Sequence, residues 1–170
     1  MRNLFKFAFV LGTLLLSEEI TSAQTPQNSV KVLAVHDGDS YKIQLIEPTW
    51  VRIMGIDCPE IISNHITENQ PYGVAIGDSI RQILKGQNVD IQIYGKDQYG
   101  RTLAKITFQG QDLADYILSK GWGHYLSPSK FDNATRLKYR KSRDIAKKNH
   151  LGIWAGNATN PKTWRKTHWK

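Results

Sequence analysis

The sequence predicts an α+β fold: a five-stranded OB-fold-type β-barrel with three α-helices. Five short segments alternate apolar and polar residues or are continuously apolar, which is typical of strands. Two longer segments carry apolar residues near helical spacing, and a third, strongly basic one follows a helix-capping residue. One helical segment separates the third strand from the fourth and two follow the fifth, an order that suits an OB-type barrel. On these patterns alone, other small α+β folds fit nearly as well.

Three strands open the predicted barrel. Residues 30–34 and 41–45 alternate apolar and polar side chains on either side of an Asp-Gly-Asp-Ser turn at 37–40, so they predict a hairpin-like pair. Residues 50–56 form a more continuously apolar third strand, in which Gly55 indicates a bulge or bend. This strand must end at the Asp-Cys-Pro-Glu sequence that follows, because proline cannot continue a central ladder.

A helix and two strands complete the predicted barrel. Residues 61–71 show no period and are rich in small polar residues, which predicts a loop. Residues 72–84 carry apolar residues near helical spacing and end before a glycine. The fourth and fifth strands are predicted over residues 89–93 and 102–108, and the second helix over 111–120.

The C-terminal part of the chain is basic. A third helix over residues 134–148, capped by Asp132 or Asn133, carries many lysines and arginines. We expect most of them to form a solvated face that also attracts phosphates without sequence preference. Residues 157–170 are polar and basic and include two tryptophans, so a disordered basic C-terminal tail is expected.

The chain therefore divides into four predicted parts. Residues 1–23 indicate a secretory signal peptide, since basic residues precede a short apolar run and small residues end at Ala23, the expected cleavage site. The apolar run is too short to span a bilayer as a helix, although an N-terminal anchor is the alternative. A flexible leader (24–28), the barrel domain (29–156) and the basic tail (157–170) follow. The protein is accordingly expected to be secreted or periplasmic, without stable membrane insertion after cleavage, and by default a monomer.

Composition narrows the classes of partner. The net charge of +8 predicts attraction to polyanions, which include nucleic acid, anionic lipid and acidic glycan. Cys58 is the single cysteine, so an intramolecular disulfide and a paired-cysteine zinc site are excluded. The five histidines show no metal-ligand spacing.

Three carboxylates and two guanidiniums lie beside predicted strand ends or turns, where a packed core would not need them. They are Asp39, Arg52, Asp57, Glu60 and Arg101. Such groups suit phosphodiester cleavage, in which a divalent cation and fixed arginines hold phosphate charge and a carboxylate accepts a proton from the attacking water. Each has an ordinary structural explanation when taken alone, and only the combination points to this chemistry.

Three motifs in this order resemble the staphylococcal nuclease (thermonuclease) family. They occupy residues 35–40, 51–60 and 97–104, and a Gly-Ile-Trp match at 152–154 extends the resemblance over about 30–154. The resemblance implies a calcium-dependent endonuclease that hydrolyses DNA and RNA with little sequence specificity. It also implies products with 5′-hydroxyl and 3′-phosphate ends.

The resemblance also implies a role for each matched residue. Asp39 and Asp57 correspond to the carboxylates that bind Ca²⁺, and the backbone carbonyl of Cys58 to a further ligand. The family usually has threonine at this cysteine position, so metal affinity is expected to differ. Glu60 corresponds to the general base, and the phosphate clamps correspond to Arg52 and Arg101.

Two tyrosines are further candidates for substrate contact. Tyr99 and Tyr125 could stack on a base or contact a phosphate, as aromatic residues do in single-strand binding, and core or rim packing is the alternative for both. Two other functions also stay open at this point. One is a non-catalytic OB-fold module that binds nucleic acid, and the other is a secreted protein that binds glycans or a host surface.

Overall fold

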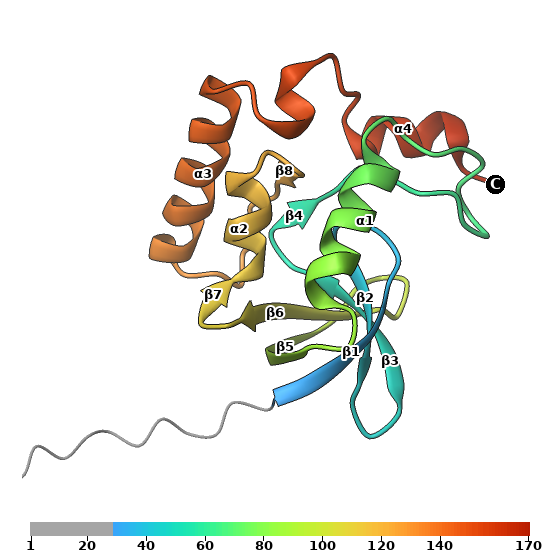
Figure 1. Ribbon diagram of the computed structural model, residues 1–170, viewed down its shortest axis with the longest axis vertical. Helices are drawn as coiled ribbons and strands as arrows, with labels where there is room; N and C mark the ends of the chain where they lie inside the picture. The colour runs from blue at the N-terminus through green and yellow to red at the C-terminus, as the bar shows by residue number, and fades with distance from the viewer. Residues whose placement is uncertain (1–28) are drawn as a thin grey trace, which may run out of the picture.

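The computed structural model describes residues 29–170 (Figure 1). The predicted signal peptide and leader, residues 1–28, lie outside the described residues. None of the helices formed by residues 29–170 is long and apolar enough to cross a membrane.

Five strands form a closed mixed β-barrel, which confirms the predicted fold class. The strands pair in the order β3-β2-β1-β5-β6, and a parallel pairing of β3 with β6 closes the ring. All other neighbours in the ring are antiparallel. The five strands are β1 (Ser29–Val35), β2 (Ser40–Gln44), β3 (Pro48–Ile53), β5 (Asn88–Lys96) and β6 (Thr102–Phe108).

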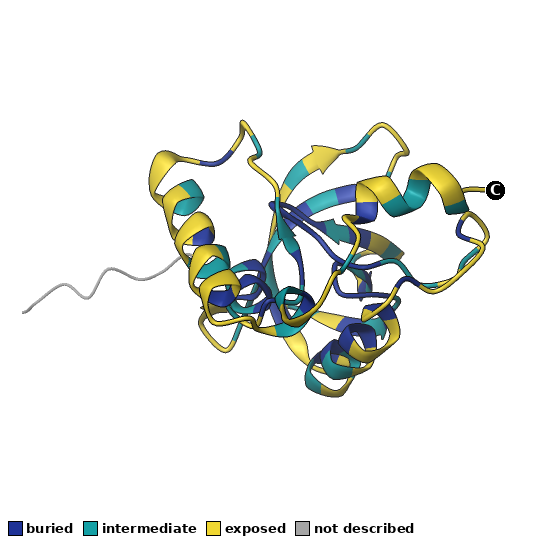
Figure 2. Cartoon of the chain, turned by 90° about the horizontal axis from the view of Figure 1, so that it is seen from above, coloured by how far each residue is buried: buried dark blue, intermediate teal, exposed yellow. Residues whose placement is uncertain are grey.

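Alternation of side chains along these strands builds the core. Tyr41 and Ile43 on β2 and Val51 and Ile53 on β3 are at most 1% exposed, whereas the residues between them are only partly buried. Successive strand side chains point to opposite faces, so one face of each strand fills the barrel. Figure 2 shows buried residues gathered in the barrel and on the inward sides of the helices.

Four α-helices accompany the barrel and gather at one end of it (Figure 1), one helix more than predicted. The predicted three are observed within two residues of their expected ends, and the fourth lies in the segment expected to be disordered. The helices are α1 (Gly73–Leu84), α2 (Leu113–Ser119), α3 (Asn133–Lys148) and α4 (Pro161–His168), with a 3₁₀ helix η1 (Gly152–Ala155) before α4. Short strands β4 (Ile56–Asp57), β7 (Gln111–Asp112) and β8 (His124–Tyr125) complete the fold.

Helix α3 shows how a strongly basic helix is held on the domain. Asp132 is its N-cap, accepting a hydrogen bond from the backbone N–H of Thr135 at 2.7 Å. Tyr139 is fully buried, and its hydroxyl donates to the Asp112 carboxylate at 2.8 Å. Several basic side chains of α3 are exposed, but Lys138, Arg143 and Lys147 contact other side chains of the domain, so the expected solvated face is observed only in part.

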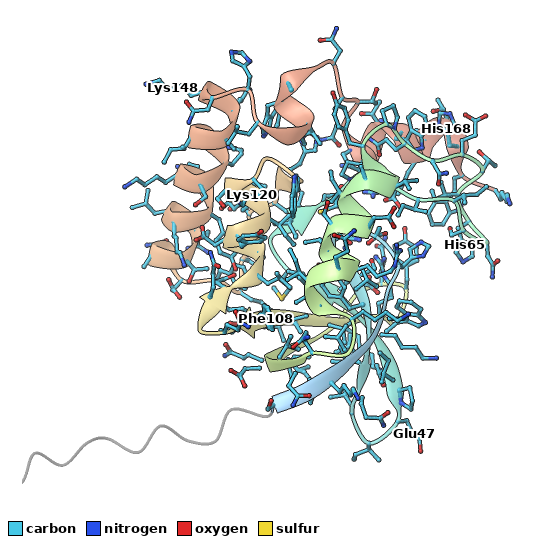
Figure 3. All side chains as sticks on the ribbon, in the orientation of Figure 1. Glu47, His65, Phe108, Lys120, Lys148 and His168 are labelled. Atoms are coloured by element: carbon cyan, nitrogen blue, oxygen red, sulfur yellow. The ribbon has the colours of Figure 1, made fainter. Side chains whose placement is uncertain are left out.

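Helix α4 corrects the expectation of a disordered tail. Asn160 caps it by accepting from the N–H of Lys162 at 2.9 Å, and Pro161 occupies its first turn, where a missing N–H costs nothing. Its C-terminal end is tied to the loop before α1, because the N–H of Thr67 donates to the carbonyl of His168 at 2.9 Å. Figures 1 and 3 show α4 beside this loop, with His65 and His168 on the same side of the molecule.

Candidate active site

A cavity of about 1170 Å³ lies between the barrel and α4. Its walls come from β3, the segment after β4, the turn between β5 and β6, and α4. The residues that line it include Arg52, Glu60, Tyr99, Arg101, Arg165 and Trp169. All three residues predicted to be catalytic, Arg52, Glu60 and Arg101, therefore line the same cavity.

Arg52 lies at the centre of the site and joins two buried carboxylates. Its Nη1 is 2.8 Å from Asp39 Oδ1, and its Nη2 is 2.6 Å from Asp57 Oδ1. The Arg52 side chain is 13% exposed, and the two aspartates are 2% and 4% exposed. Burial disfavours the charge on Arg52, but Asp39 and Asp57 outweigh burial and raise its pKa.

The strand register brings these three residues together. Arg52 on β3 pairs with Ser40 on β2, directly after Asp39, and the N–H of Ile53 donates to the Asp39 carbonyl at 2.9 Å. Beyond β3 the chain bends at Gly55, whose φ of 88° favours glycine, and enters β4. The predicted bend at Gly55 is therefore observed, and it divides the predicted third strand so that Asp57 faces Arg52.

Cys58 contacts the site through its backbone, whereas its thiol is buried. Its N–H donates to Asp39 Oδ2 at 2.7 Å, while its side chain is 2% exposed. Burial raises the pKa of the Cys58 thiol, and the neighbouring aspartates add to the shift. A thiol held neutral in this way packs and is a poor nucleophile.

Glu60 lies in the irregular segment that follows β4. Its side chain is 13% exposed and forms an ion pair with Arg165 of α4. Burial raises the pKa of Glu60, and the hydrogen bond from Arg165 opposes that shift. A carboxylate with a raised pKa beside a cavity is a suitable general base.

Asp37 is a buried carboxylate whose place in the site the sequence prediction missed. It is 5% exposed and accepts a hydrogen bond from the N–H of Asp39 at 3.1 Å. Burial raises its pKa well above the usual value, and the charges of Asp39 and Glu60 raise it further. The sequence offers an ordinary structural role for Asp37, because aspartate followed by glycine is typical of a tight turn.

Arg101 enters the cavity from the turn between β5 and β6. Its Nε donates to Asp97 Oδ2 at 2.7 Å, and its side chain is 38% exposed. The Tyr99 ring beside it is 65% exposed, with the Arg101 guanidinium 5.5 Å from the ring centroid. Both predicted residues thus lie at the cavity mouth, apart from the buried cluster around Arg52.

Tyr125 does not line this cavity. It lies on β8, where it pairs with Ile56 of β4, and its ring faces the guanidinium of Arg143 at 5.5 Å. Core packing, the alternative considered for this residue, describes its surroundings.

Three cavity residues, Lys162, Arg165 and Trp169, lie in the segment that the sequence predicted to be a disordered tail. Arg165 contacts both Asp57 and Glu60, and Trp169 stacks on His65 with 5.3 Å between ring centroids. A signal was present, because Asn160 followed by Pro161 is a typical helix start. The basic composition of the segment concealed it.

The donor set suits a hard divalent cation. Among residues 29–170, no group of three or more His, Cys, Asp or Glu side chains is arranged to hold a metal ion. A cation at Asp39 and Asp57 would therefore depend also on the Cys58 carbonyl, water and substrate, all of them oxygen donors that calcium accepts. Carboxyl groups outnumber guanidiniums in this cluster, in which Asp37, Asp39, Asp57 and Glu60 lie around Arg52 and Arg165.

Comparison with known proteins shows similarity to nucleases. Residues 50–156 match the family model described as staphylococcal nuclease homologue. A staphylococcal-like nuclease of Arabidopsis thaliana is 30% identical over 119 residues, which cover 68% of this chain and 33% of that protein. A probable endonuclease of Leptosphaeria maculans is 30% identical over 112 residues, or 62% of this chain and 37% of that protein.

A bacterial relative matches over more of its length. An uncharacterized endonuclease of Haemophilus influenzae is 26% identical over 161 residues, which cover 92% of this chain and 84% of that protein. By contrast, the chain spans about a third of the length of the plant and fungal relatives.

Proposed function

The chain belongs to the staphylococcal nuclease family, and on that premise we propose that it is a calcium-dependent endonuclease that hydrolyses DNA and RNA with little sequence specificity. The observation that carries the proposal is the Arg52 cluster. One buried guanidinium joins two buried carboxylates at a cavity that Glu60 and Arg101 also line. These are the groups that phosphodiester cleavage requires.

The two arginines bind the phosphate from neighbouring strands, since Arg52 lies on β3 and Arg101 directly precedes β6, which pairs with β3. Arg52 uses one N–H of each terminal nitrogen on aspartates, which leaves guanidinium donors for a phosphate oxygen. Arg101 reaches the same cavity from the turn between β5 and β6. Guanidinium forks pair with phosphate oxygens and keep their charge, so they stabilise the charge that develops in the transition state.

Asp39, Asp57 and the carbonyl of Cys58 would hold the calcium ion. A bound divalent cation supplies further neutralisation of the phosphate charge in the transition state. The excess of carboxylates over guanidiniums supports this assignment.

Glu60 accepts the proton of the attacking water. Its carboxylate lies on the cavity wall, 13% exposed, and a base of this kind typically contributes about 10²–10⁴-fold in rate. Attack at phosphorus expels the 5′ oxygen and gives 5′-hydroxyl and 3′-phosphate ends, an outcome carried over from the family resemblance.

Contacts to phosphate rather than to base edges account for weak sequence preference. Tyr99 adds an exposed ring on which an unpaired base can stack, so single-stranded or unwound regions are cut best. The signal-like pattern of residues 1–23 supports secretion or periplasmic location, and a monomer is proposed by default.

The test compares the protein with its Glu60→Gln variant on denatured DNA and on RNA, with calcium and with a chelator. We expect calcium-dependent degradation that falls by about 10²-fold or more in the variant. Binding of nucleic acid without cutting, equal in both proteins, would instead identify a non-catalytic binding module. Binding only to glycans or cell surfaces, unaffected by calcium, would favour the third class of function.

A further inference from the structure

Arg165 forms a bridge between the two carboxylates at the reaction centre. Its Nη1 donates to Glu60 Oε1 and lies 3.0 Å from Asp57 Oδ1, and its Nη2 lies 2.9 Å from Asp57 Oδ2. Burial disfavours the charge on Arg165, but the interactions with Asp57 and Glu60 are larger than the effect of burial and raise the pKa of Arg165. This planar fork fits two carboxylates at once, which a lysine ammonium does not.

The backbone of Glu60 is held independently of Arg165. Its carbonyl accepts from the N–H of Gln70 at 2.9 Å, and its N–H donates to Gln70 Oε1 at 3.1 Å. The Glu60 carboxylate is different, because its one hydrogen-bond partner among residues 29–170 is Arg165. The direction in which the carboxylate points therefore depends on α4.

Helix α4 is anchored to the same segment that carries Glu60. The Gln70 side chain donates to the carbonyl of Thr159 at 2.5 Å, just before the helix. After the helix, Trp169 pairs with Ile66, and the N–H of Lys170 donates to the carbonyl of His65 at 2.9 Å. Contacts at both ends thus fix the distance between the helix and the loop.

We propose that Arg165 is a positioning residue that holds the Glu60 carboxylate toward the cavity, so that α4 is a working part of the reaction site. The inference deepens the proposed nuclease function and rests on it. Without Arg165, the carboxylates of Glu60 and Asp57 would repel each other across the cluster, and Glu60 would turn toward solvent. Rate would then fall although the substrate still binds.

Steady-state kinetics on denatured DNA with saturating calcium gives the first test. Arg165→Ala should lower kcat by roughly 10²-fold, the lower end of what a general base contributes, while KM changes less than about threefold. Arg165→Lys should recover part of the loss. Lys166→Ala, which removes the same charge from the adjacent exposed residue, should match the wild type. A wild-type kcat for Arg165→Ala would overturn the proposal, as would a loss confined to KM.

A double-mutant cycle separates positioning from direct contact with the phosphate. If Arg165 acts through Glu60, then adding Arg165→Ala to Glu60→Gln lowers kcat by less than about threefold, since the base is already absent. A full multiplication of the two losses would show that Arg165 acts independently of Glu60, on the substrate or through Asp57, and would reject the proposed positioning of Glu60.

Thermal unfolding in chelator provides a readout that needs no activity. Arg165→Ala should lower Tm more in the wild-type background than in the Glu60→Gln background, because the Arg165–Asp57 ion pair is lost in both and the Arg165–Glu60 ion pair only in the former. Equal losses of Tm in both backgrounds would show that Arg165 does not interact with Glu60 and would overturn the proposal. A wild-type protein that cuts no nucleic acid would reject the proposed function, and the unfolding cycle would still decide whether Arg165 holds Glu60.

Discussion

Arg52 and Arg101 face the same cavity but are held in different ways. Arg52 is 13% exposed and joins two buried aspartates across strand ends of the barrel, whereas Arg101 is 38% exposed and pairs with one aspartate within its own turn. Removing Arg52 leaves the buried Asp39 without an ion pair and leaves Asp57 with Arg165 alone, whereas removing Arg101 leaves one partly exposed carboxylate without its partner. We therefore expect Arg52 to contribute both to the stability of the fold and to catalysis, and Arg101 to contribute mainly to catalysis.

The largest expected effect is on the stability of an Arg52→Ala variant. Loss of one partner from a buried ion pair typically costs about 3–5 kcal/mol, so we expect a loss of this size in the free energy of unfolding. Urea denaturation in chelator measures it, since bound metal would mask the unpaired carboxylates. Arg52→Lys keeps the positive charge but lacks the planar guanidinium, so its free energy of unfolding should lie between those of the wild type and Arg52→Ala. A loss below about 1 kcal/mol would remove the distinction between the two arginines.

The next effect is on the activity of an Arg101→Ala variant. We expect the rate on denatured DNA to fall by about 10³-fold, as for other arginines that stabilise phosphoryl charge. The unfolding free energy should change by less than about 1 kcal/mol, because exposed ion pairs contribute little. Asp97→Ala, which removes its partner, serves as the matched control and should retain most of the activity. A stability loss equal to that of Arg52→Ala would contradict the comparison.

The smallest expected effect is on the stability of an Asp37→Asn variant, because Asp37 is buried close to other carboxylates. The pKa of Asp37 is raised by burial and by Asp39, so the folded state binds its proton more tightly than the unfolded chain does. Ionisation of Asp37 therefore costs stability as pH rises from its unfolded pKa toward its folded one, and the full cost remains at higher pH. Asp37→Asn should relieve it.

Thermal unfolding of this variant against pH, in chelator, measures the relief. Asp37→Asn should raise Tm at pH 7 by about 2 °C or more relative to the wild type, and the difference should shrink toward pH 4. A difference that does not change with pH would mean that Asp37 is not the source of the penalty.

The barrel and three of the helices could be predicted because their signal is local. Alternation along residues 41–45 and the apolar spacing of residues 72–84 follow directly from which side of each element is buried. Helix α4 escaped prediction because a helix of eight residues is marginal alone and depends on tertiary contacts, here with Gln70 and Thr67.

The candidate site divides in the same way. Asp39, Arg52, Asp57 and Glu60 were recognised from short motifs, and the structure brings them into one cluster, of which Arg52 and Glu60 line the cavity. Their catalytic and metal-binding roles stay predictions. Tyr125 was chosen for its residue type alone, and nothing in its neighbouring sequence indicated that β8 would direct it toward Arg143.

By itself, the sequence determined the barrel, the basic charge and the motif residues, since periodicity and turn chemistry act over a few neighbouring residues. Only the tertiary structure decided that Arg165 joins Asp57 and Glu60 from more than one hundred residues away. The reason is physical: an ion pair depends on distance in space, and no local pattern encodes which distant side chain will complete a buried cluster of charges.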